Sequence, residues 1–103
     1  HTGHPGSGSL TSALKWLDGF LREIQASSIW PETAVIVVWD ESGGWWDHVA
    51  PPKGDRWGPG SRIPAIVVSP FAKKGAVDHN FYDTTSILRF ITRLHHCGPP
   101  GAN

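Results

Sequence analysis

One apolar run constrains the fold of this chain most strongly. Residues 33–39 read Thr-Ala-Val-Ile-Val-Val-Trp, a continuous stretch rich in β-branched side chains. Such a stretch is typical of a strand buried on both faces, as in the middle of an α/β sheet. Asp40 and Glu41 follow it directly, and Gly43 and Gly44 come next. The sequence therefore predicts a buried strand that ends in an acidic turn, which is where ligands usually bind in open α/β sheets.

The second apolar run and two amphipathic segments complete the pattern. Residues 63–68 predict another strand, with Pro64 near its start. Leucine and isoleucine recur at spacings of three and four over residues 10–24, which predicts a helix that Ser7 or Ser9 could cap. A similar pattern, with Ile87, Leu88, Ile91 and Leu94 on one face, predicts a second helix that Asp83 or Thr84 could cap.

The predicted order is helix, strand, long loop, strand, helix, which is part of an α/β sandwich. Residues 40–61 hold many Gly and Pro residues and show no regular period. A loop this long in a compact domain is usually functional or disordered. Because two strands alone make a poor sheet, we expect the rest of the sheet to lie outside this chain.

Composition limits the classes of function. The 103 residues are enough for one modest domain, and the formal net charge is zero, so nothing favours nucleic acid as a partner. The single cysteine excludes an internal disulfide framework. No apolar run is long enough to cross a bilayer, and no signal peptide is visible. The chain has no methionine, so we expect it to be a piece of a longer protein.

Asp40 and Glu41 are the first candidates for chemistry. Beyond the end of the strand, the backbone can turn so that both carboxylates converge on one hard divalent cation, such as Mg²⁺, Ca²⁺ or Mn²⁺. Gly43 and Gly44 permit the positive φ angles that a sharp turn requires. On spacing alone, however, an ordinary solvated turn is favoured over a metal site, because acidic turns after strands are common.

The histidines and the basic residues leave alternatives open. His48 could bind a metal or phosphate or transfer protons, with Asp47 orienting its ring, and a structural role in the loop is equally compatible with the sequence. His4, taken alone, is better explained as a surface histidine. Three basic residues near the loop could hold a phosphate or a carboxylate, although ordinary solvated side chains are favoured. They are Lys53, Arg56 and Arg62.

The motifs taken together resemble those of the bacterial phosphoesterase family, which includes acid phosphatases and non-haemolytic phospholipases C. The resemblance starts from VWDESGGWWDHVAPP at residues 38–52 and continues through KGDRWGPGSRIP at residues 53–64. It extends through SPFAKKG at residues 69–75 and YDTTSILRFI at residues 82–91. His4 and Pro5 resemble the family's His-Pro motif. The stretch from Lys53 to Gly60 is more similar to the phosphatase branch than to the phospholipase branch.

The resemblance implies an alkaline-phosphatase-like α/β/α sandwich and hydrolysis of phosphate esters, such as monoesters or phospholipids. It implies that Asp40 and Glu41 bind a divalent metal ion, whose identity could be Ca, Mg, Mn or Zn. His4 matches a histidine near the substrate phosphate, and His48 lies in the matching Asp-His-Val motif. The resemblance further implies a periplasmic or secreted enzyme.

The family's nucleophile and its Glu-Asn metal motif lie N-terminal to the matching region and have no counterpart here. We therefore expect residues 1–103 to form the C-terminal part of a larger catalytic domain, and the isolated chain to be inactive or nearly so. Two other readings remain. One is a non-catalytic α/β module that binds a partner or ligand, and the other is a sulfatase-like or phosphomutase-like relative.

Overall fold

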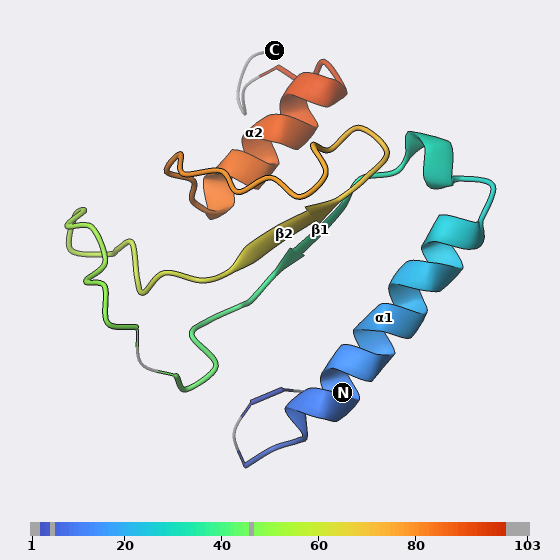
Figure 1. Cartoon of the computed structure of the whole chain (residues 1–103). Helices are drawn as coiled ribbons and strands as arrows, with labels where there is room; N and C mark the ends of the chain where they lie inside the picture. The colour runs from blue at the N-terminus through green and yellow to red at the C-terminus, as the bar shows by residue number, and fades with distance from the viewer. Residues whose placement is uncertain (1–2, 5, 46, 99–103) are drawn as a thin grey trace.

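The computed structural model describes residues 3–4, 6–45 and 47–98, so Pro5 of the His-Pro motif lies outside the described residues. Helix α1 (Leu10–Ala26) is followed by a short 3₁₀ turn, η1 (Trp30–Glu32), and by strand β1 (Val35–Val38) (Figure 1). A long loop leads to strand β2 (Ala65–Val68), and helix α2 (Thr84–Leu94) comes last. The α/β class and the order of elements predicted from the sequence are confirmed.

The two strands form an antiparallel ribbon. Val35 pairs with Val68 at one end and Val38 with Ala65 at the other, so β1, the loop and β2 form one long hairpin. The expectation that β1 is buried on both faces is wrong for this chain. Its side chains are partly exposed, and Val38 is 40% exposed. The physical reason is that no helix covers either face of the ribbon among the described residues.

Helix α1 begins and ends where local chemistry requires it. The Ser9 side chain accepts a hydrogen bond from the Ser12 N–H at 3.4 Å, so Ser9 is the N-cap. Beyond Ala26, the Ser27 N–H donates to the Ile24 carbonyl at 3.1 Å. Pro31 then lies near the start of η1, where a missing N–H costs nothing.

Helix α2 begins with a capping box. The Asp83 carboxylate accepts the Ser86 N–H at 3.1 Å, and the Ser86 hydroxyl accepts the Asp83 N–H at 3.1 Å. Two backbone N–H groups that have no partner within the helix are hydrogen-bonded in this way. The helix also carries exposed apolar side chains, including Leu88 at 55% and Leu94 at 59%.

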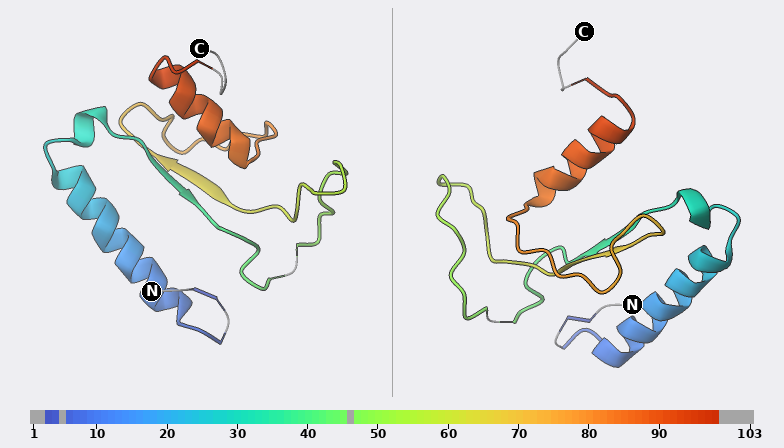
Figure 2. Two further views of the ribbon diagram at one scale, coloured as in Figure 1. Left: turned by 180° about the vertical axis from the view of Figure 1, so that it is seen from behind. Right: turned by 45° about the horizontal axis from the view of Figure 1, so that its top comes forward.

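The two helices lie on opposite sides of the hairpin in all three views (Figures 1 and 2). Neither packs against the strands, and no residue in the described part of the chain is buried. Trp16 and Phe20 stack on each other on α1 with centroids 5.4 Å apart, yet both remain more than 40% exposed. Apolar faces on both helices and on the ribbon are therefore uncovered. Neither α1 nor α2, the α-helices of the described residues, has the length and apolar character that a membrane span requires.

Candidate functional site

A tight turn follows the acidic pair. Gly43 and Gly44 have φ angles of 68° and 75°, and the Trp45 N–H donates to the Ser42 carbonyl at 3.2 Å. Positive φ at both central residues is the signature of a type I′ turn, which reverses the chain sharply. The chain therefore reverses directly after the acidic pair, which itself follows the end of β1.

The segment before α1 returns to this acidic pair. The Nε2 atom of His4 lies 3.6 Å from Oε1 of Glu41, and both side chains are about half exposed (47% and 52%). Two of the residues that the family resemblance assigned to the site are therefore neighbours. Residue spacing alone offers no argument for bringing His4 to this place, and only the family resemblance suggested it.

The donor set fits a hard cation in part. Asp40 and Glu41 supply carboxylate oxygens, which suit hard divalent ions, and both residues are exposed at the loop. Among the described residues, however, no group of three or more His, Cys, Asp or Glu side chains is arranged to hold a metal ion. Within the described part of the chain, Asp40 and Glu41 are therefore too few to enclose a cation on their own.

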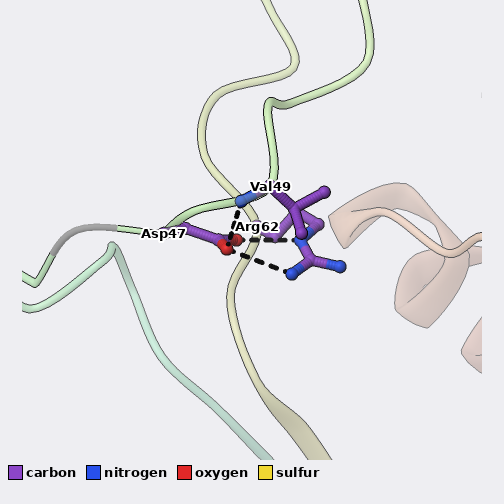
Figure 3. Close-up of polar contacts among 3 residues, drawn as sticks. All are labelled: Asp47, Val49 and Arg62. Carbon is purple, nitrogen blue, oxygen red and sulfur yellow. Dashed lines mark hydrogen bonds and ion pairs between the residues drawn. The ribbon is translucent and has the colours of Figure 1, made fainter.

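Asp47 and Arg62 join the two arms of the long loop (Figure 3). The guanidinium of Arg62 donates from Nε to one carboxylate oxygen at 2.8 Å and from a terminal nitrogen to the other at 3.1 Å. The Val49 N–H donates to the same carboxylate at 2.9 Å. These hydrogen bonds lower the pKa of Asp47 from 3.8 to about 2. The bonding to Arg62 is the largest cause, and the bond from Val49 is the second.

His48 is exposed beside this ion pair. Because Asp47 directs both carboxylate oxygens to Arg62 and Val49, the hypothesis that Asp47 orients the His48 ring is not supported by these contacts. Arg62 is not simply solvated, because its guanidinium binds the carboxylate of Asp47 within the chain. Whether it also holds a phosphate or carboxylate ligand stays a prediction.

The outer part of the loop is held by local contacts. The Asp55 carboxylate accepts the Trp57 N–H at 2.8 Å, and the Arg56 guanidinium lies 4.3 Å from the centroid of the Trp57 ring. A shallow hollow of about 560 Å³ separates this part of the loop from the start of α2 and includes Lys53 in its lining. Neither Asp40 nor Glu41 lines that hollow.

Comparison with known proteins places these features in a family. The sequence matches the Phosphoesterase family over residues 1–98. This chain belongs to that family. The resemblance seen in the motifs is therefore confirmed.

Several phosphoesterases similar to this chain have curated names. It is 31% identical to the non-hemolytic phospholipase C of Pseudomonas aeruginosa, over 85% of this chain and 17% of that protein. It is 30% identical to phospholipase C B of Mycobacterium tuberculosis, over 85% of this chain and 22% of that protein. It is 31% identical to non-specific phospholipase C6 of Arabidopsis thaliana, over 88% of this chain and 22% of that protein. The chain thus spans roughly a fifth of the length of these relatives. No solved structure gives a significant match.

Sequence reasoning overlooked two contacts of this phosphoesterase chain. The Asp47–Arg62 pair joins residues 15 positions apart in a loop with no regular period, so no spacing rule indicates it. The contact between His4 and Glu41 crosses a helix and a strand. For Asp47 and Arg62 the sequence signal was a pair of opposite charges, and for His4 it was a ligand-type residue in a glycine-rich segment. Neither signal specifies which residue is the partner.

Proposed function

We propose that this chain forms one side of the active site of a metal-dependent enzyme that hydrolyses phosphate esters. One observation carries the proposal. In a member of the Phosphoesterase family, an exposed acidic pair lies at the end of a strand, with a histidine 3.6 Å from one of its carboxylates. Carboxylates beside a histidine suit both a divalent cation and the anionic phosphate that the cation attracts.

Asp40 and Glu41 would hold the divalent ion, which could be Ca, Mg, Mn or Zn. A bound divalent cation polarises the phosphoryl oxygens and offsets the negative charge of the phosphate that repels a nucleophile. The positions of Asp40 and Glu41, directly after β1 and just before the sharp turn at Gly43 and Gly44, are compatible with this role.

The histidines would act on the substrate itself. His4 lies close enough to Glu41 for its ring to reach a phosphate held at the acidic pair, where it would donate a hydrogen bond to a phosphoryl oxygen. His48 would supply a proton to the leaving group, a task suited to imidazole near neutral pH.

The remaining parts of the site would come from a preceding, N-terminal segment of the same catalytic domain. That segment would provide the nucleophile and further metal ligands, and it would complete an alkaline-phosphatase-like α/β/α sandwich. Two observations support this proposal. No described residue is buried, and the chain spans about a fifth of its phospholipase C relatives. A domain cannot be stable with its apolar faces uncovered.

The substrate would be a phosphate monoester or a phospholipid. The stretch from Lys53 to Gly60 favours the monoester, whereas the relatives named above are phospholipases C. The enzyme would work in the periplasm or outside the cell, a proposal that rests on the family resemblance alone.

The test uses the complete polypeptide that carries this sequence, assayed on p-nitrophenyl phosphate and on phosphatidylcholine vesicles with each cation. D40N and E41Q should abolish hydrolysis and weaken cation binding in calorimetry. D18N is the matched control, since Asp18 lies on the exposed surface of α1. Hydrolysis that survives in D40N and E41Q would overturn the proposal. Cation binding without hydrolysis of any phosphate ester would favour the non-catalytic module instead.

A further inference from the structure

The loop between the strands is long, and few contacts organise it. Residues 39–64 connect the ends of β1 and β2. Among the described residues of this loop, the other contacts between two loop residues are local, such as the Ser42–Trp45 turn and the bridge between Asp55 and Gly58, while Glu41 contacts His4 outside the loop. The Asp47–Arg62 pair is different, because it joins the arm leaving β1 to the arm returning to β2 (Figure 3).

The position of the pair divides the loop into two parts. The inner part, adjoining the sheet, contains the acidic pair and the Gly43–Gly44 turn. The outer part, residues 48–61, begins with His48. Because Arg62 lies just before β2, whose pairing with β1 is fixed, the bond at Arg62 anchors Asp47 to the sheet. The inner part is then held at both ends, by β1 and by Asp47.

We propose that Asp47 and Arg62 form a positioning pair for the active site, which holds the acidic pair and His48 at a fixed spacing. This inference rests on the proposed function, since it concerns the same site. Neither residue touches the substrate. Two parallel bonds from a planar guanidinium to a carboxylate fix orientation as well as distance, which a single ion contact does not.

The geometry separates this pair from an ordinary surface ion pair. Exposed pairs contribute little, because solvent screens them and long side chains lose freedom. The Arg62 side chain is 54% exposed, but the Asp47 side chain is only 20% exposed and accepts a third bond, from the Val49 N–H. The same chain offers a matched comparison on α1, where Arg22 donates one bond to Asp18 at 2.9 Å within a single helical segment and both side chains are more than 60% exposed.

The experiment uses the complete polypeptide and four variants: D47N, R62Q, the double variant D47N/R62Q, and D18N as control. The readouts are kcat and KM for p-nitrophenyl phosphate and the dissociation constant of Mn²⁺ measured by calorimetry. Loss of a supporting partner typically costs about 10- to 100-fold in metal affinity or activity. We expect D47N and R62Q to lower kcat and weaken Mn²⁺ binding within that range, with KM little changed.

The double variant should lose no more than either single variant, because both substitutions remove the same contact. The positioning role is wrong if the fold-losses of D47N and R62Q multiply in the double variant. It is also wrong if D47N and R62Q lose no more activity and Mn²⁺ affinity than D18N does. R62K is a milder change that keeps the charge but not the planar fork, and it should fall between wild type and R62Q. If R62K equals wild type while R62Q is impaired, charge alone matters and the proposal is wrong.

The failure of this inference can be told from the failure of the proposed function. D40N tests the proposed function directly, by loss of Mn²⁺ binding and hydrolysis. If D40N loses both while D47N and R62Q behave as wild type, the positioning role fails and the metal site stands. If D40N changes neither, the proposed function fails, and with it the site that the pair was inferred to position.

Discussion

The Nε2 atom of His4 lies 3.6 Å from Oε1 of Glu41, although helix α1 and strand β1 separate the two residues along the chain. The segment before α1 must therefore run back to the far end of the strand. Because both side chains are about half exposed, the contact itself adds little stability. Its importance is that it places an imidazole beside a carboxylate that is a candidate cation ligand.

The first prediction follows from that placement. Ca²⁺ bound by Asp40 and Glu41 would draw Glu41 away from His4 and change the electrostatic surroundings of the ring. In NMR spectra of the complete polypeptide, the ring resonances of His4 should shift on addition of Ca²⁺, and E41Q should remove the shift. The ring of His95, at the end of α2, is the control and should not respond. Equal shifts at the two histidines would contradict a site at the acidic pair.

The elements of this fold were largely predictable, because local chemistry sets them. The two β-branched runs are visible in the sequence, which also offered Ser7 or Ser9 and Asp83 or Thr84 as caps. The structure has Ser9 and Asp83 as the N-caps. The burial of β1 was not predicted correctly. A continuous apolar run indicates that a strand is suited to a core, but whether other elements cover it depends on packing that lies beyond its own residues.

The site was predictable only in part. Asp40 and Glu41 stand out as a pair, and the positive φ angles at Gly43 and Gly44 agree with the expected turn. The partner of Arg62 could not be found, because an irregular loop has no period that brings given residues together. Motif resemblance supplied His4 where spacing could not.

The second prediction concerns the turn after the acidic pair. Gly43 has a φ of 68°, and an added Cβ would lie 3.3 Å from Cδ1 of Trp45. An alanine in this left-handed region costs about 1–2 kcal/mol. In G43A of the complete polypeptide, the Trp45 amide should exchange with solvent roughly tenfold faster, since about 1.4 kcal/mol corresponds to a factor of ten. G60A is the control, because nothing lies within 4 Å of a Cβ at Gly60. An unchanged exchange rate would mean that the turn tolerates a side chain.

The third prediction concerns pH. Arg62 first, and the Val49 N–H second, lower the pKa of Asp47 from 3.8 to about 2. A carboxyl whose pKa is lowered by folding stabilises the folded state above its unfolded value, and that contribution is lost as pH falls through the folded value. The Asp47–Arg62 pair should therefore persist at pH 4 and open near pH 2.

Carbon NMR of the Asp47 carboxyl can measure this titration in the complete polypeptide. R62Q should raise the midpoint toward the ordinary value, because the largest cause of the shift is removed. R22Q alters the exposed pair on α1 and should leave Asp47 unchanged. A midpoint for Asp47 that does not move in R62Q would show that Arg62 does not hold this carboxyl in solution.

The last prediction addresses the uncovered apolar face of α1. Leu17 lies on that face together with Leu10, Leu14 and Leu21, and it is not buried in this chain. If a further segment of the catalytic domain covers the face, L17A creates a cavity and should lower the free energy of unfolding of the complete polypeptide by about 2–5 kcal/mol. If Leu17 stays exposed in the complete polypeptide, L17A should change the free energy of unfolding by only about 0.5 kcal/mol.

Urea unfolding followed by circular dichroism measures this difference, with E23A as the control, because Glu23 is exposed on the opposite side of the helix. E23A should stay close to wild type while L17A shifts the midpoint to lower urea. If the two variants unfold alike, the face of α1 is open in the complete protein as well. The sandwich inferred for this domain would then lack a cover on that side, because a helix layer that packs on nothing cannot bury the sheet beneath it.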